Sequence, residues 1–335
     1  MKQEGIKTIK VRDYRKLHPD MPSLKLARII YNENNLQFTN VEDARGVLRR
    51  IEGKHGNNER KSMKNKDLII ENARPYNPYS LPESDAKDRT PIKLPMACNN
   101  ILLISDLHIP YHDIQAITIA LDFGKEQNVN TIFINGDLID FSQISKFDSD
   151  LSKRNTKQEF DATKQFLVSL RAAFPLAEIY WLKGNHCIRW EKFLMQKVKE
   201  IWNDDYFSLE QRLNLNEQRV HLLDDKVLVK AGKLSITHGH HIMRGFFSPV
   251  NSARGVYMKA KQSTIIGHVH KVSTHSETDM DGNSVTTYSM GSLCEKRPDY
   301  SPLVSSYQHG FAHVLIDNNG DYHLKNYQIV KGKIF

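Results

Sequence analysis

Cysteine is scarce in this chain, with only Cys98, Cys187 and Cys294 among 335 residues. An odd number of widely spaced cysteines excludes a disulfide scaffold and is typical of a reduced, intracellular protein. No run approaches the roughly 18 apolar residues of a membrane span. The first 16 residues contain no apolar core of the signal-peptide type. We therefore expect a cytoplasmic protein without a membrane partner, whose oligomeric state the sequence does not indicate.

Internal repeats of fixed period and low-complexity tracts are also absent from the chain. Hydrophobic residues make up 39% of the sequence, which is enough to bury a core and excludes a disordered protein. The length suits one large domain together with a smaller one.

The positive charge is concentrated in the first third of the chain. Residues 1–97 hold 20 Lys or Arg against 13 Asp or Glu, whereas the whole chain has a net charge of +8. The remaining residues are therefore almost neutral. Such an asymmetry indicates a polyanionic partner, such as a nucleic acid, for the first segment.

Two helices are predicted in this basic segment. Ser23 is expected to cap a helix over 24–32, and Asn40 is expected to cap another over 41–52 that stops at Gly53. One face of the second helix is an apolar stripe, formed by Val41, Ala44, Leu48 and Ile51. Its basic residues, which could contact nucleic acid, are Arg45, Arg49, Arg50 and Lys54. The pattern resembles a helix-turn-helix with a long connection, and the alternative is a small helical appendage with solvated arginines.

Proline marks a boundary after this segment. Residues 75–98 contain five of the twelve prolines, which favours an extended linker. The expected domains are a small basic helical domain over 1–74, the linker, and a large domain over 99–335.

In the large domain, five apolar segments of strand type run directly into metal-type side chains. The segments are 101–104, 131–135, 178–183, 233–237 and 263–266. The side chains that follow them are Asp106 and His108, Asp137 and Asp140, Asn185 and His186, His238, and His268 and His270. Because ligand sites form beyond the carboxyl ends of strands in α/β sheets, we expect these groups on one rim.

The remaining pattern alternates strand and helix and then becomes rich in strands. Predicted helices cover 114–126, 158–173, 188–201 and 209–213. Further strands are predicted over 226–231, 271–278, 284–289, 311–316 and 321–328. This order argues for a mixed α/β sheet with helices on its faces.

The ordered set DxH, GDxxD, GNH, a lone His before Gly, and GHxH resembles the calcineurin-like metallophosphoesterases, in particular phage and bacterial types with an amino-terminal helix-turn-helix-like segment. The resemblance covers residues 100–330. It implies a four-layer α/β/β/α sandwich with a small amino-terminal helical domain. It also implies one metal site of Asp106, His108 and His270, a second of Asn185, His238 and His268, and Asp137 as the bridge. His186 would act on the substrate as the catalytic residue.

The implied chemistry is hydrolysis of phosphate esters by water activated on two divalent metal ions. Manganese is the expected metal, with zinc, iron, magnesium and nickel as alternatives. Together with the basic first third, this predicts a nuclease or phosphodiesterase acting on nucleic acid or nucleotides. The alternatives are a small-molecule or protein phosphomonoesterase with a structural amino-terminal segment, and a non-catalytic binding protein on the same fold.

Two departures from the family pattern affect this interpretation. Cys187 stands where the family usually has an acid that orients the histidine, so either the acid step is weakened or another carboxylate substitutes for it. Phe141 and Ser142 stand where the Ser/Thr protein phosphatases have Arg-Gly, which argues against that class. The candidate substrate contacts are Arg189, Arg244, Arg254 and His309. We expect structural roles for Asp140 and, as hydrogen-bonded histidines, for His240, His241 and His275.

Overall fold

The computed structural model of the chain describes residues 5–19, 21–55, 68, 90–145, 155–202, 204–243, 250–278, 280–297 and 305–335. The chain divides into two compact units, Met1–Lys87 and Asp88–Phe335. Most of the predicted linker 75–98 falls outside the described residues. Its extent therefore stays a prediction, as do the bounds 1–74 and 99–335.

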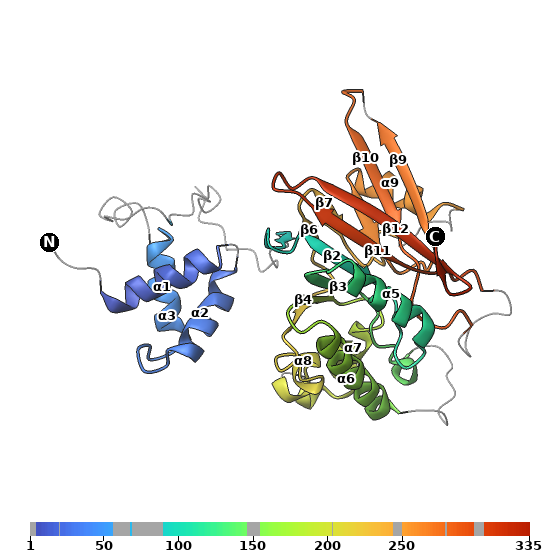
Figure 1. Cartoon of the computed structure of the whole chain (residues 1–335). Helices are drawn as coiled ribbons and strands as arrows, with labels where there is room; N and C mark the ends of the chain where they lie inside the picture. Colours follow the sequence, from blue (N-terminus) through green and yellow to red (C-terminus); the bar gives the residue numbers. More distant parts are fainter. Residues whose placement is uncertain are drawn as a thin grey trace, which may run out of the picture. The chain divides into compact units, whose positions relative to one another are not determined.

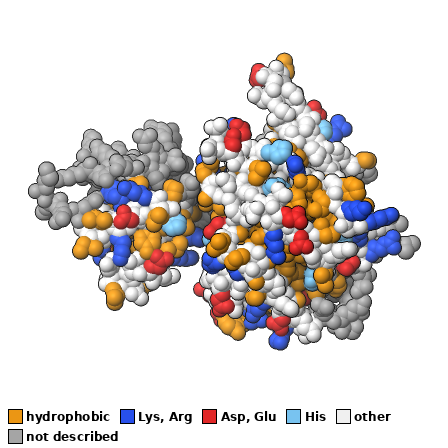
Figure 2. All heavy atoms as spheres, viewed as in Figure 1, with side chains coloured by type: hydrophobic (Ala, Val, Ile, Leu, Met, Phe, Trp, Pro, Cys, Tyr) orange, Lys and Arg blue, Asp and Glu red, His pale blue; other side chains and the backbone are white. Residues whose placement is uncertain are grey.

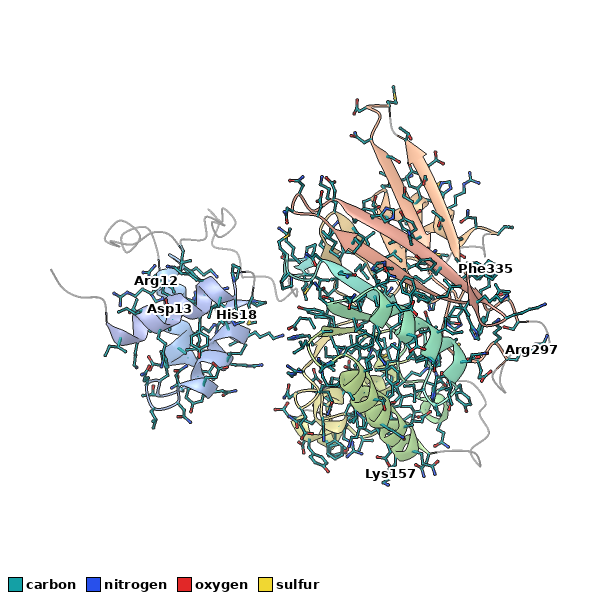
Figure 3. The ribbon with its side chains drawn as sticks, viewed as in Figure 1. Arg12, Asp13, His18, Lys157, Arg297 and Phe335 are labelled. Carbon is teal, nitrogen blue, oxygen red and sulfur yellow. The ribbon has the colours of Figure 1, made fainter. Side chains whose placement is uncertain are left out.

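In its described residues, the amino-terminal unit contains three helices around a core of its own (Figure 1). They are α1 (Ile6–Leu17), α2 (Ser23–Glu33) and α3 (Val41–Ile51). The core is formed by Val11, Leu26, Ala27, Ile30, Phe38, Ala44, Leu48 and Ile51. The apolar stripe of α3 is thus confirmed. Helix α1 was not predicted, because its buried face includes Arg12 and Arg15, which break the apolar periodicity. Figure 3 shows Arg12 and Asp13 on this helix and His18 just after it.

The two predicted helix caps have different outcomes. The Asn40 side chain accepts a hydrogen bond from the Asp43 N–H at 2.8 Å, which confirms this cap. The Ser23 cap is wrong, because Ser23 is already the first helical residue and Pro22 precedes it. The Ser23 hydroxyl instead donates to the Glu52 carboxylate at 2.8 Å. Glu52 is fully buried, and a buried carboxylate is stable only with hydrogen-bond or ion-pair partners. Arg15 and Lys54 also contact this carboxylate.

The larger unit contains a seven-stranded sheet in the order β13-β12-β11-β2-β3-β4-β5. Its four parallel strands are β2 (Asn100–Ile104), β3 (Thr131–Asn135), β4 (Glu178–Leu182) and β5 (Val220–Leu223). Its antiparallel strands are β11 (His309–Ile316), β12 (Tyr322–Val330) and β13 (Lys333–Ile334).

A six-stranded sheet in the order β1-β6-β7-β8-β10-β9 lies against the first sheet. Its strands are β1 (Ile92–Lys93), β6 (Val229–Ala231), β7 (Leu234–Ile236), β8 (Thr264–Ile266), β9 (Ser273–Thr278) and β10 (Ser284–Ser289). The register of β7 and β8 is parallel, with Ile236 beside Ile265. This pairing aligns the carboxyl ends of the two strands.

Side-chain alternation along β2 shows how the layers form. Ile101 and Leu103 pack into the core between the two sheets, whereas Leu102 and Ile104 pack toward the helices. The helices on that outer face are α5 (Ile114–Glu126), α6 (Thr156–Ala173), α7 (Ile188–Lys197) and α8 (Leu209–Arg212). Helix α9 (Ser252–Ala260) packs against β8, β9 and β10 on the outer face of the smaller sheet (Figure 1). The predicted four-layer α/β/β/α sandwich is therefore confirmed.

Some elements differ from their predicted bounds. The helix predicted over 188–201 ends at Lys197, and a separate 3-10 turn covers Lys199–Ile201. Strand β5 and helix α9 were not predicted, because β5 is only four residues long and α9 contains Gly255. In the part of the chain that the structure describes, no helix is long and apolar enough to cross a membrane.

Candidate metal centre

The predicted metal ligands converge because they follow strands whose carboxyl ends share one edge. In the larger sheet, Ile104 pairs with Ile134 and Asn135 pairs with Leu182, so β2, β3 and β4 end side by side. In the smaller sheet, β7 and β8 end together in the same way. The loops that follow these five strands bring together Asp106, His108, Asp137, Asn185, His238, His268 and His270.

The first predicted group lies at the end of β2. Asp106 Oδ1 is 3.1 Å from His270 Nε2 and 3.8 Å from His108 Nε2. The Nε2 atoms of His108 and His270 are 3.3 Å apart. All three side chains are buried. Such spacings are those of neighbouring ligands around a single ion, for which metal–ligand bonds measure about 2.0–2.2 Å.

The second predicted group is adjacent. His238 Nε2 is 3.1 Å from Asp137 Oδ2 and 3.2 Å from Asn185 Oδ1. The His268 imidazole offers a ligand atom within 4.8 Å of those of Asp137 and His238. Asp137 Oδ2 also lies 3.9 Å from His108 Nε2, so this carboxylate is positioned between the two groups.

The donor set fits a pair of divalent cations. Burial alone would raise the pKa of Asp106 and of Asp137, yet the facing imidazoles hold both pKa values well below their usual range. The centre thus contains two buried, ionised carboxylates that need positive charge close by. Imidazole, carboxylate and amide oxygen are ligands of intermediate hardness that suit manganese, iron and zinc.

Backbone strain is concentrated at the same residues. Five of the seven predicted ligands have left-handed backbone conformations, with φ between +32° and +65°: Asp106, His108, Asp137, His268 and His270. Non-glycine residues adopt this region rarely, at a cost of about 1–3 kcal/mol each, and such strain gathers at functional sites. Gly184 supports the arrangement, because a Cβ atom there would collide with the Asp137 carboxylate. The fold therefore holds these side chains in place against their local preference.

His186 lies beside the ligand set and is oriented by Asp140. Asp140 Oδ1 is 2.9 Å from His186 Nδ1 and 2.7 Å from His108 Nδ1. Arg189 donates to the Asp140 carbonyl oxygen at 3.0 Å, and its Nη2 is 3.1 Å from His186 Nε2. With Nε2 accepting from the guanidinium, Nδ1 carries the proton and donates to Asp140. Asp140 thus supplies the orienting carboxylate that the sequence lacks after Gly184-Asn185-His186.

Cys187 has a structural environment. Its side chain is fully buried in the core beneath the helices. Burial raises the pKa of the Cys187 thiol to about 12. A thiol that stays protonated is a poor nucleophile, so this environment argues against covalent catalysis by Cys187.

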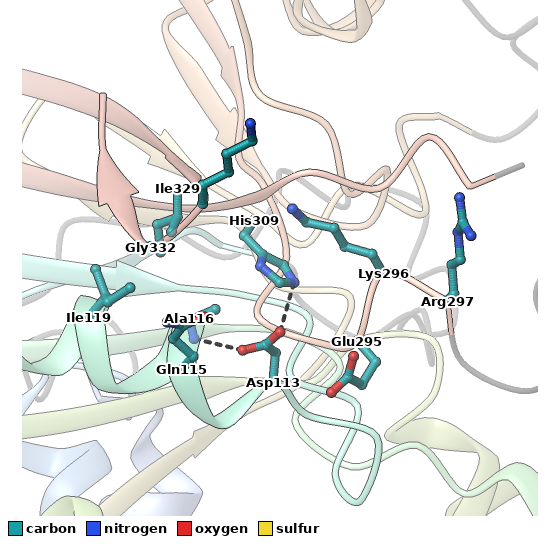
Figure 4. A pocket seen from close by; sticks show the side chains of 11 residues that line it. Asp113, Gln115, Ala116, Ile119, Glu295, Lys296, Arg297, His309, Ile329 and Gly332 are labelled. Carbon is teal, nitrogen blue, oxygen red and sulfur yellow. Dashed lines mark hydrogen bonds and ion pairs between the residues drawn. The ribbon is translucent and has the colours of Figure 1, made fainter.

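The other predicted substrate contacts are dispersed. Arg254 is exposed on α9, which covers the outer face of the smaller sheet. The Nε2 atom of His309 lies 2.8 Å from the Cys294 carbonyl oxygen and 3.6 Å from Asp113 Oδ2, so its contacts are with residues outside the predicted ligand set. Figure 4 shows His309 in a cavity of about 330 Å³ whose lining includes none of the predicted ligands. Arg244 lies outside the described residues.

At least two of the four basic residues predicted to contact nucleic acid are paired within their own unit. Arg45 binds Glu42 at 3.0 Å, and Lys54 binds the buried Glu52 at 2.7 Å. Arg49 is half-buried, and Arg50 is exposed. On the face shown in Figure 2, Lys and Arg side chains of this unit are mixed with acidic and apolar ones.

A further group of polar side chains was missed in the sequence. Asp225 follows strand β5 and contacts both His240 and His241, for which we expected only structural roles. The available signal was the same as elsewhere, an apolar strand that runs into acidic residues. It was overlooked because Val220–Leu223 had not been recognised as a strand.

Glu159 on α6 provides a test of the buried electrostatics near this centre. Its carboxylate is buried and accepts hydrogen bonds from the Ser142 N–H and hydroxyl, both at 3.2 Å. Burial raises the pKa of Glu159 to about 7. The folded state then holds a proton that the unfolded state, with a pKa of about 4.3, releases. Relative to high pH, the protonated Glu159 side chain therefore stabilises the folded state fully below the unfolded-state pKa of about 4.3. This contribution to the free energy of unfolding is lost as the pH rises through the folded-state pKa of about 7.

We therefore expect Glu159→Gln to flatten the pH dependence of stability. Between pH 5 and pH 8, the free energy of unfolding of the native chain should fall relative to that of the variant by about 3 kcal/mol. Urea unfolding of both proteins at several pH values measures this difference. Parallel pH profiles would show that Glu159 has an ordinary pKa.

Comparisons with known proteins identify the family of this chain. The sequence model of the calcineurin-like phosphoesterases matches residues 100–288. The Gene 54 protein of Mycobacterium phage D29 is 26% identical over 230 residues, which cover 65% of this chain and 89% of that protein. Vacuolar Protein Sorting 29 from Cryptosporidium parvum is 15% identical, with a TM-score of 0.40, and covers 71% of this chain and 94% of its own. YfcE, a phosphoesterase from E. coli, is 14% identical, with a TM-score of 0.31, and covers 68% of this chain and 98% of its own. Because the family match spans more than half of the sequence, this chain belongs to the calcineurin-like phosphoesterase family.

Proposed function

We propose that this protein is a phosphoesterase that uses two divalent metal ions and acts on nucleic acid or nucleotides. The observation that carries the proposal is the convergence of six side chains of metal-ligand type around a seventh, Asp137. Asp106, His108 and His270 would hold one ion, and Asn185, His238 and His268 would hold the other. The complete ligand set favours the enzymatic interpretation over the non-catalytic alternative, which the replacement of the usual acid by Cys187 had suggested.

The bound ions would neutralise the phosphoryl oxygens and lower the pKa of a coordinated water to near neutrality. The protein residues then have separate tasks. Asp137 is held in place by the backbone N–H of His186, which donates a hydrogen bond to Asp137 Oδ1 at 2.7 Å. His186, oriented by Asp140, presents its imidazole beside the ligand set and would stabilise the developing charge or protonate the leaving oxygen after its Nε2 takes up a proton and releases Arg189. Arg189 adds a cation next to this imidazole.

The preference for a polyanionic substrate is supported by the basic amino-terminal unit and its three-helix arrangement. A second candidate, a phosphomonoesterase for metabolites or phosphoproteins, is favoured by the internal pairing of Arg45 and Lys54. The two differ in whether the amino-terminal unit binds nucleic acid.

A substrate survey with the manganese-loaded chain tests the activity. We expect turnover of phosphodiesters, including DNA or RNA, that is abolished by a chelator and restored by manganese. Absence of turnover of diesters and monoesters with every divalent metal would refute the enzymatic proposal. Turnover of monoesters alone would favour the second candidate.

Nucleic-acid binding is tested separately through its salt dependence. Replacing both Arg49 and Arg50 by Gln should make the slope of log K against log salt shallower by up to about 1.8, because each phosphate contact contributes about 0.9. Arg45→Gln is the matched control and should leave the slope unchanged, since Glu42 already holds Arg45. Equal slopes for all three proteins would exclude α3 as the contact surface.

A further inference from the structure

A second cluster of metal-type side chains lies beside the centre described above. Asp225 follows β5 in the larger sheet, and His240 and His241 follow β7 in the smaller sheet. Asp225 Oδ2 is 2.9 Å from His241 Nε2 and 3.4 Å from His240 Nε2. One ligand atom from each of the three residues lies within 4.8 Å of the other two. Both sheets thus contribute to one compact set of a carboxylate and two imidazoles.

We propose that Asp225, His240 and His241 form a third binding site for a divalent cation, of the type that binds zinc. Three protein ligands with nitrogen and oxygen donors are the usual set of an open tetrahedral zinc site, whose fourth position is left to water or substrate. In such a site the ligand atoms lie about 3.3–3.6 Å apart, as follows from metal–ligand bonds of about 2.0–2.2 Å. The distance from Asp225 Oδ2 to His240 Nε2 lies in this range, and the distance to His241 Nε2 is shorter, so a small movement of His241 would complete the site.

Hydrogen bonding alone accounts less well for the position of His240. Its contact with Asp225 is longer than the 2.7–3.2 Å of an ordinary N–H···O bond. Its Nδ1 atom is buried and has no hydrogen-bond partner among the residues that the structure describes. The ring is therefore held near the carboxylate by one long hydrogen bond from Nε2, and its other nitrogen has no partner among the described residues. A cation bound to Nε2 and Asp225 would replace this long contact by two metal–ligand bonds.

The third site is close to the proposed metal pair but separate from it. The ring centroid of His240 lies 5.4 Å from that of His238 and 6.1 Å from that of His268. None of the three ligands belongs to the pair. His241 is almost half exposed, with 45% of its side-chain surface accessible, which gives an ion access from solvent. A cation here would extend the positive charge of the centre in the direction of β5 and β7.

Metal stoichiometry tests the site without relying on activity. The chain is stripped with a chelator, dialysed against Zn²⁺, and its metal content is measured by mass spectrometry. We expect three ions per native chain and two in both His241→Gln and Asp225→Asn. The control is His221→Gln, which disrupts another histidine–carboxylate pair, with Glu178 at 3.0 Å, and should retain three. Equal metal content in the native chain, His241→Gln and Asp225→Asn would overturn the proposal.

The test remains decisive if the proposed metal pair is absent. In an Asp137→Asn background, adding His241→Gln should still remove one zinc ion per chain. Failure of the pair alone would lower the content of both proteins but leave this difference. If Asp225→Asn does not fold, His241→Gln decides the outcome, because the exposed His241 side chain contributes little to the core.

Discussion

Replacing Asp137 by Asn is expected to abolish binding of the metal pair and to lower kcat/KM at least about a thousandfold, since two-metal stabilisation contributes several kcal/mol. The asparagine oxygen can still accept the hydrogen bond from the His186 N–H. Its amide group would then face His238, where the carboxylate now lies 3.1 Å from Nε2. A donor group would thus replace the proposed bridging ligand without a change in size.

Metal analysis and steady-state kinetics with a phosphodiester measure the two effects on one preparation, and circular dichroism checks the fold. The control is Asp161→Asn, which removes a half-exposed carboxylate on α6 whose partner is Lys157. This control should keep both metal content and rate. An Asp137→Asn variant that retains two ions and a rate within tenfold of the native one would disprove the bridging role.

Replacing His186 by Asn is expected to lower kcat by about 10²–10⁴-fold while the metal content stays unchanged. The reason is that His186 is held by Asp140 and Arg189, outside the proposed ligand set. Asp140→Asn should lower the rate as well, because the imidazole would lose its orienting carboxylate. Stopped assays at saturating substrate, together with metal analysis, separate loss of the imidazole from loss of the ions.

Cys187→Ala serves as the control for the histidine variants. The buried thiol should be dispensable for the reaction, so the rate of this variant should stay within a few-fold of the native rate. Abolished turnover in a folded Cys187→Ala protein would instead identify the thiol as a nucleophile. Loss of metal in His186→Asn would identify His186 as a ligand, which the proximity of His108, Asp137 and His186 would then explain.

The sequence predicted the convergence of the ligand-type side chains better than it predicted the elements around them. The strands that precede these side chains are short, apolar and buried, and each runs within three residues into one of them, so local pattern and final structure agree. Helix α5 was predicted with its observed bounds, because Asp113 caps it and its apolar face is regular. These features depend on local preferences that tertiary packing reinforces.

The missed features depend on contacts between distant residues. Helix α1 buries Arg15 against Glu52, a residue that lies 37 positions further along the chain. The short strand β5 is defined by its pairing with β4, for example Ile179 with Val220. Asp225 gained its histidine partners only through that pairing. A supporting role was expected for Asp140, but its contact with His186 was not predicted, because that contact depends on how the loops after β3 and β4 meet.

Anomalous diffraction from crystals grown with Mn²⁺ would locate the bound metal ions. The proposed function predicts two manganese peaks on opposite sides of the Asp137 carboxylate. One should lie about 2.0–2.4 Å from donor atoms of Asp106, His108 and His270, and the other at a similar distance from those of Asn185, His238 and His268. A fully loaded crystal with no manganese peak next to Asp137 would contradict it.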